Sequence, residues 1–173
     1  MEIPLSVMFD TGKRRFAAWI AFALAIMLAD QAAKWAIVEW IPVFGKVPIN
    51  SFLNLTHQHN AGAAFSFLAD SAGWQRWFFV VLATGVSSVL AVWIWRIRNE
   101  GPALLGAALA LVLGGALGNV IDRIRLGYVT DFIQVWFGNW AFPSFNVADA
   151  AITVGAAILI FDSLFLSGRE HRA

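Results

Sequence analysis

Long uncharged apolar runs constrain this chain more than any other feature of its sequence. Trp77–Trp95 is a run of 19 residues without a charge, and Pro102–Ile121 is a run of 20. A helix of this length spans roughly 28 Å, which is close to the thickness of the hydrocarbon core of a membrane. Tryptophans stand at both ends of the first run, where the membrane interfaces would lie. The runs therefore predict membrane-spanning helices.

The composition supports the same class of protein. Of the 173 residues, 60% are hydrophobic and 13% are charged, whereas a soluble domain has about 25% charged residues. The net charge of +1 gives no indication of a nucleic-acid partner. The absence of cysteine excludes a disulfide framework, a thiolate nucleophile and a cysteine metal site. We predict an α-helical polytopic membrane protein that forms one domain over residues 1–173.

Polar segments and helix breakers divide the chain into four predicted transmembrane helices, at about 16–40, 74–96, 102–122 and 144–166. The first helix follows the basic cluster Lys13–Arg15, as a cleavable signal peptide would, but its apolar run continues beyond Asp30, which favours a retained helix. The two long connecting segments are about 41–73 and 123–143. Partial alternation over Phe52–Thr56 predicts a small β-rich element in the first of them.

The positions of the basic residues predict the orientation of the helices. With a cytoplasmic N-terminus, the short inner segments carry Lys13, Arg14, Arg15, Arg96, Arg98, Arg169 and Arg172. Short segments rich in Lys and Arg usually stay in the cytoplasm. We therefore predict that both termini are cytoplasmic and that 41–73 and 123–143 lie on the outer side.

Three aspartates then share the outer side. Asp122 ends the third helix, Asp131 lies in the second long segment, and Asp149 falls in the first turn of the fourth helix if Ser144 or Asn146 is its N-cap. Two carboxylates close together in apolar surroundings do not both ionise readily, so one keeps a proton. Such a pair activates a water molecule and polarises a peptide carbonyl in aspartic proteases.

Each aspartate also has a structural interpretation, which the residues alone leave open. Asp149 would stabilise the N-terminus of a helix, and Asp131 would be a turn residue. Asp122 would pair with Arg123 or Arg125, which follow it directly.

Three further patterns bear on the helices and the β-rich element. Asp30 and Lys34 are spaced for an ion pair on one helical face, which either neutralises itself near the membrane surface or faces a site. A small residue at every fourth position from Gly106 to Gly118 predicts a close contact between helices. His57 and His59 share one face of the predicted strand, where surface histidines are favoured over an incomplete metal site.

Five motifs occur in the order typical of one family. They are Asp30-Gln31 with Lys34, then Asn60–Ser66, Gly115–Asn119 with Asp122-Arg123, Val129–Phe132, and Phe142–Asp149. Over about Phe16 to Leu166 the chain resembles lipoprotein signal peptidase (signal peptidase II), the bacterial aspartic protease family that removes signal peptides from prolipoproteins.

The resemblance implies that Asp131 and Asp149 are the catalytic dyad. It implies supporting or substrate-facing roles for Asp30, Lys34, Asn60, Gly62, Asn119, Asp122, Arg123 and Asn146. It also implies an outer β-cradle after the first helix, and an active site at the outer face of the bacterial inner membrane. The implied substrate is a prolipoprotein with a diacylglyceryl-modified lipobox cysteine, cleaved just before that cysteine. Membrane lipid is the other implied partner, and no metal, organic cofactor, nucleic acid or obligate protein partner is implied.

Two other classes of membrane protein compete with this interpretation. A small transporter or channel would line an ion path with the acids, but it predicts internal repeats or broken midplane helices, which we do not find. A structural membrane subunit would use the Gly106–Gly118 ridge as a partner surface. That interpretation leaves the convergent acids unexplained.

Overall fold

The computed structural model describes residues 5–62 and 74–166 of the chain. Within them, the helices are α1 (Leu5–Trp40), α2 (Trp74–Arg96), α3 (Ala103–Arg125) and α4 (Val147–Phe161), and the π-helical turn η1 (Asp162–Leu166) extends α4. In this part of the chain, 4 helices are long and apolar enough to cross a membrane. The predicted set of four spanning helices is confirmed.

Two helix starts differ from the prediction. α1 begins at Leu5 rather than near residue 16, so the basic cluster is helical. Arg15 donates hydrogen bonds to the carbonyls of Asn99 (3.1 Å) and Gly101 (2.6 Å), which ties this end of α1 to the α2–α3 turn. α4 begins at Val147 rather than at residue 144, because Asn146 is its N-cap.

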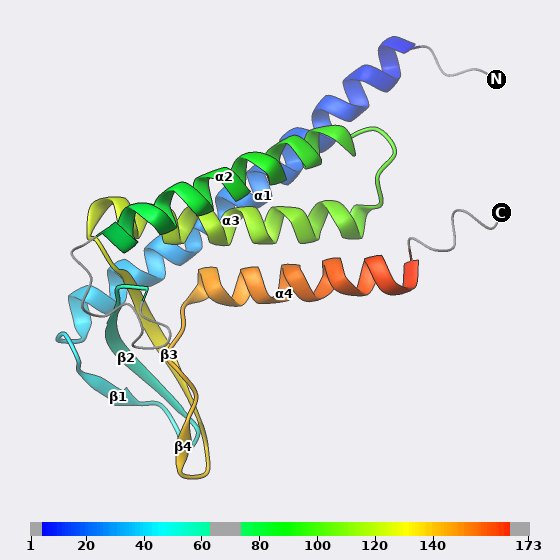
Figure 1. Ribbon diagram of the computed structural model, residues 1–173. Coiled ribbons are helices and arrows are strands. Elements are labelled where there is room, and N and C mark those ends of the chain that lie inside the picture. The colour runs from blue at the N-terminus through cyan, green and yellow to red at the C-terminus, as the bar shows by residue number, and fades with distance from the viewer. Residues whose placement is uncertain (1–4, 63–73, 167–173) are drawn as a thin grey trace.

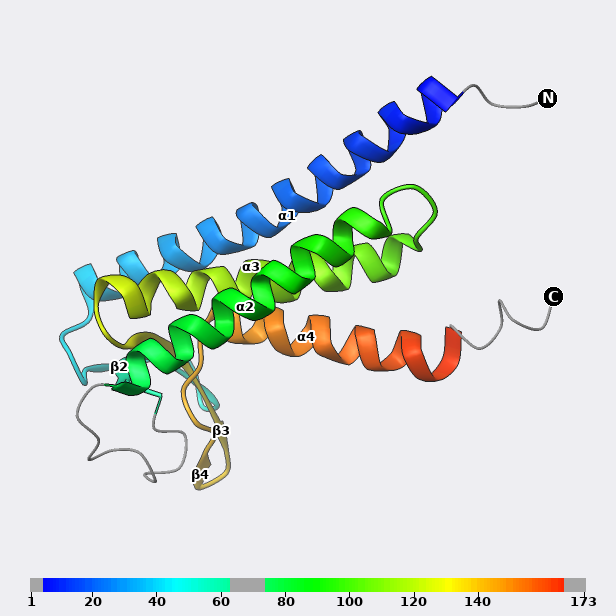
Figure 2. The same ribbon diagram turned by 45° about the horizontal axis from the view of Figure 1, so that its top comes forward.

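A four-stranded antiparallel sheet lies at one end of the helices. Its strands are β1 (Lys46–Pro48), β2 (Leu53–Asn60), β3 (Val129–Phe137) and β4 (Trp140–Ala141), in the order β1-β2-β3-β4. Figures 1 and 2 show the sheet at the end of the bundle opposite the start of α1 and the end of α4. The predicted β-rich element is confirmed in β2, but the sheet also includes β3, which lies within the predicted connecting segment 123–143.

The predicted small-residue ridge brings α3 close to α1. A Cβ atom added at Gly114 would lie 2.5 Å from the Ala23 carbonyl oxygen, and one added at Gly118 would lie 2.7 Å from Asp30 Oδ2. On another face of α3, Gly115 packs against the backbone of Ala148 in α4. α3 is the most deeply buried of the four helices, so its last turns lie between α1 and the start of α4.

Candidate active site

Asp131 is a buried residue of β3, where Gln58 of β2 is its partner in the register. Its Oδ2 accepts a hydrogen bond from Asn60 Nδ2 at 2.9 Å, and its Oδ1 accepts one from Asn146 Nδ2 at 2.8 Å. The alternative that Asp131 is a turn residue is wrong, because it lies inside a paired strand.

The amide of Asn60 has a fixed orientation. Its Oδ1 accepts the backbone N–H of Gly62 at 2.9 Å, which leaves Nδ2 facing Asp131. Gly62 has a φ of 93°, and a Cβ atom there would lie 2.5 Å from Cε2 of Phe79 in α2. Only glycine fits this backbone conformation and this approach without strain.

Asp149 lies in the first turn of α4 and forms a capping box with Asn146. The Asp149 N–H donates to Asn146 Oδ1 at 2.8 Å, and the Asn146 N–H donates to Asp149 Oδ2 at 3.3 Å. Asn119 Nδ2 donates to the other carboxylate oxygen of Asp149 at 2.8 Å. The helix-stabilising interpretation of Asp149 is therefore correct. Asn146 also contacts Asp131, so one residue joins both carboxylates.

A buried ionic network lies behind these carboxylates. Lys34 Nζ is 2.7 Å from Asp30 Oδ2, 2.9 Å from Asp122 Oδ2 and 3.0 Å from Asn119 Oδ1. The predicted pairing of Asp30 with Lys34 is confirmed. Asn119 accepts from Lys34 through its oxygen, so its nitrogen is free to face Asp149.

The alternative that Asp122 pairs with Arg123 or Arg125 is wrong. Asp122 faces α1, where its Oδ1 accepts from Gln31 Nε2 at 2.8 Å, and its Oδ2 accepts the Thr130 N–H of β3 at 3.2 Å. Among the described residues, Arg123 makes no ion pair. Its guanidinium donates to the Asn119 carbonyl at 3.2 Å and lies 5.1 Å from the centre of the Phe79 ring.

Two members of the network lay outside the predicted site. Gln31 belongs to the motif Asp30-Gln31 with Lys34, and its Nε2 also donates to the Gly118 carbonyl at 3.1 Å. Its position beside Asp30 in an apolar helix was the available signal. Thr130 contributes only its backbone N–H to Asp122 and its carbonyl to Asn146, and such contacts leave no trace in side-chain patterns.

Burial makes Asp131 a weaker acid than an ordinary aspartate. Desolvation raises the pKa of Asp131 to about 6, the hydrogen bond from Asn60 opposes the rise, and the charge of Asp149 adds to it. A carboxyl group with this pKa can hold a proton near neutral pH beside an ionised carboxylate. Such a pair can supply one acid and one base for general acid–base chemistry.

His57 and His59 are not a pair of surface histidines. His57 is buried, with Nδ1 2.8 Å from the Ile41 carbonyl oxygen, and its Nε2 is 3.2 Å from His59 Nε2. His59 stacks on Tyr128 with 3.8 Å between ring centroids. Among residues 11–62 and 74–166, no group of three or more metal-ligating side chains is present. The two rings are therefore held by the Ile41 carbonyl, by each other and by the Tyr128 ring.

An apolar groove of about 500 Å³ opens beside Asp149. Its walls come from the segment before α4 and from the first turns of α4: Phe142, Pro143, Ser144, Phe145, Ala150, Thr153 and Val154. The site therefore places a carboxylate at the edge of an apolar channel. The rest of the Asn60–Ser66 motif, Ala63 to Ser66, lies outside the described residues.

Comparisons with known proteins agree on one family. The family described as "Signal peptidase (SPase) II" matches residues 22–165. A lipoprotein signal peptidase of Acinetobacter baumannii is 48% identical over 154 residues, which is 89% of this chain and 87% of that protein. One of Yersinia pestis is 45% identical over 155 residues, 90% of each chain. A bacterial membrane enzyme solved by the in meso method at 1.9 Å resolution is 30% identical, with a TM-score of 0.76 over 87% of this chain and 95% of that one.

Proposed function

This chain belongs to the signal peptidase II family, and from that premise we propose that it is an aspartic endopeptidase with Asp131 and Asp149 as its catalytic dyad. It cleaves signal peptides from diacylglyceryl-modified prolipoproteins just before the lipobox cysteine. The observation that carries the proposal is the bridge made by Asn146, whose side chain donates to Asp131 at 2.8 Å and whose backbone donates to Asp149 at 3.3 Å.

The reaction uses the two carboxyl groups in different protonation states. The ionised carboxylate takes a proton from a water molecule, and the resulting hydroxide attacks the scissile peptide carbonyl. The protonated carboxyl group polarises that carbonyl, and a proton then passes to the leaving amine as the peptide bond breaks. The raised pKa of Asp131 supports its role as the protonated member.

The surrounding amides and ions hold the two groups without entering the reaction. Asn60 and Asn119 each donate to one member of the dyad. Lys34 fixes Asn119 from behind through a bond of 3.0 Å. Catalytic groups held this closely need little reorganisation during the reaction.

The setting suits a substrate that is itself embedded in lipid. The four spanning helices make the chain a multi-pass bacterial membrane protein. The groove beside Asp149 is apolar, so it suits a lipid chain or an apolar stretch of signal peptide that approaches from within the membrane. With both termini in the cytoplasm, the dyad lies near the outer interface, where water is available.

A cleavage assay tests the assignment. Purified protein is mixed with a diacylated prolipoprotein, and the wild type is compared with Asp131→Asn and Asp149→Asn. We expect each variant to lose cleavage by at least about 10²-fold, the usual contribution of a general acid or base. Asp162→Asn, at the opposite end of the same membrane span, is the matched control and keeps activity. Retained cleavage in either dyad variant would overturn the proposal.

A further inference from the structure

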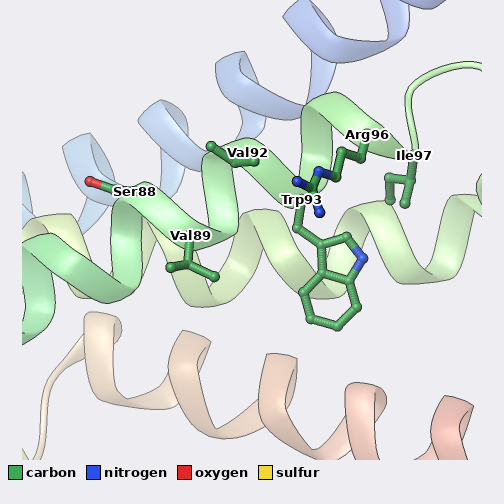
Figure 3. A pocket seen from close by; sticks show the side chains of 6 residues that line it. All are labelled: Ser88, Val89, Val92, Trp93, Arg96 and Ile97. Carbon is green, nitrogen blue, oxygen red and sulfur yellow. The ribbon is translucent and has the colours of Figure 1, made fainter.

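A second groove, of about 650 Å³, lies on the C-terminal half of α2 at the end of the bundle opposite the sheet. Its lining comes from one helix: Ser88, Val89, Val92, Trp93, Arg96 and Ile97. In Figure 3, Val89 and Trp93 point to the side on which α4 runs, and Arg96 lies above Trp93. The groove is therefore apolar along its length and cationic at one end.

We propose that this groove binds an anionic phospholipid, with one acyl chain along α2 and the phosphate on Arg96. The distance along the helix from Ser88 to Ile97 is roughly 13 Å. One leaflet contributes about half of the 30 Å hydrocarbon core, so the groove matches the depth of one leaflet. Trp93 and Arg96 then lie where the headgroups begin.

The polar groups of the groove fit this ligand. At the deep end, Ser88 Oγ donates to the Thr84 carbonyl of its own helix at 2.9 Å, so it needs no polar partner from a ligand. At the shallow end, Arg96 is exposed and makes no ion pair within the described part of the chain. Its neighbours differ, because Arg15 donates to two loop carbonyls and Arg98 to the Trp95 carbonyl at 2.6 Å.

The charge of this end of the bundle favours an anionic headgroup over a zwitterionic one. Among the described residues, Lys13, Arg14, Arg15, Arg96 and Arg98 gather at this end, against the three acids Asp10, Glu100 and Asp162. Basic clusters next to a membrane span attract anionic lipids. The groove lies at the far end of the bundle from Asp149, so its occupancy is independent of the proposed catalytic role.

Native mass spectrometry of the full chain in neutral detergent tests the site. Phosphatidylglycerol and phosphatidylcholine with the same acyl chains are titrated separately. We expect one saturable phosphatidylglycerol molecule and weaker binding of phosphatidylcholine. Arg96→Gln should weaken phosphatidylglycerol binding roughly five-fold, the effect of one basic residue near a headgroup. Arg98→Gln removes the same charge from the same turn, but Arg98 donates to the Trp95 carbonyl and does not line the groove, so it should weaken binding less than Arg96→Gln.

Two further measurements separate the lipid from other ligands. Val92→Trp fills the groove and should abolish binding of both lipids, with an unchanged helical circular dichroism spectrum. Inorganic phosphate at millimolar concentration should not displace phosphatidylglycerol. Equal binding of the two lipids, equal effects of the Arg96 and Arg98 variants, or displacement by phosphate would each overturn the proposal.

Discussion

Asp30 of α1 accepts a hydrogen bond from the backbone N–H of Ala148 in α4, at 2.9 Å and across 118 residues of sequence. The other oxygen of the same carboxylate lies 2.7 Å from Lys34 Nζ. Ala148 directly precedes Asp149, so α1 fixes the backbone next to one member of the proposed dyad. A helix that contributes no dyad residue thus positions the dyad.

Replacing Asp30 tests this support. Asp30→Asn leaves Lys34 buried with Asp122 as its remaining carboxylate partner within the described residues. We expect a loss of about 3 kcal/mol in the free energy of unfolding, as for other buried ion pairs that lose one partner. Denaturant titration of the purified protein in detergent measures it. Glu39→Gln, an exposed acid of the same helix, should change stability by less than about 0.5 kcal/mol. Similar losses in both variants would contradict the buried role of Asp30.

Gly62→Ala should strain the backbone at this position and slow the reaction. The backbone conformation, with a φ of 93°, costs a non-glycine residue about 1–2 kcal/mol, and the added methyl would meet the ring of Phe79. Because the Gly62 N–H bonds the Asn60 side chain, a displaced backbone at position 62 moves the amide of Asn60 away from Asp131. A displacement of this kind can lower kcat by about 10²-fold. The rate of prolipoprotein cleavage measures the effect.

Gly138→Ala separates the two causes. Gly138 also has a positive φ, of 62°, but no atom lies within 4 Å of an added Cβ there. We expect Gly138→Ala to lose a similar amount of stability, about 1–2 kcal/mol, while cleavage stays near the wild-type rate. Equal loss of cleavage in both variants would show that the contact with Asn60 is unimportant.

Asp131 should make the stability of the protein depend on pH. The pKa of Asp131 is about 6 in the folded state, against an ordinary value of 3.8. Between these values the folded state holds a proton that the unfolded chain has lost. The contribution to stability is therefore full below pH 3.8 and is lost as the pH rises through about 6. At about 1.4 kcal/mol per pH unit, the loss is about 3 kcal/mol.

Asp131→Asn removes this titration, because the amide stays neutral at every pH. The variant should therefore gain stability relative to the wild type as the pH rises from 4 to 8. Thermal unfolding at several pH values, with Glu39→Gln as the control, measures the difference between the proteins. A difference that stays constant over this range would contradict the raised pKa.

Local patterns predicted much of this structure. Uncharged runs such as Trp77–Trp95 located the helices, because membrane thickness fixes the length of a spanning helix. The four-residue spacing of Asp30 and Lys34 predicted their ion pair, because helical geometry places such residues on one face. Asn146 was one of two N-cap candidates, and the start of α4 at Val147 selects it.

Contacts between distant segments were not predictable in this way. β3 pairs with β2, whose register places Asp131 opposite Gln58, and nothing local to Val129–Phe137 shows that a partner strand exists. The suggested pairing of Asp122 with a neighbouring arginine was wrong for the same reason. Its actual partner, Lys34, is remote in sequence but adjacent across the α1–α3 contact. The burial of His57 was not predictable, because its polar partner is the backbone carbonyl of Ile41 and a backbone contact leaves no side-chain pattern in the sequence.

Asn146 has two separable tasks, and paired substitutions distinguish them. Its Oδ1 caps α4 through the Asp149 N–H, and its Nδ2 donates to Asp131. Asn146→Ser keeps a good N-cap but has no amide donor, so we expect a loss of about 1–3 kcal/mol from the buried acceptors left unpaired, and cleavage reduced about 10²-fold. Asn146→Ala loses both, and should add a loss of about 1 kcal/mol in stability. Unfolding and cleavage assays on the same preparations give both quantities. If cleavage fell only in proportion to stability across the two variants, Asn146 would be a cap and would not align the dyad.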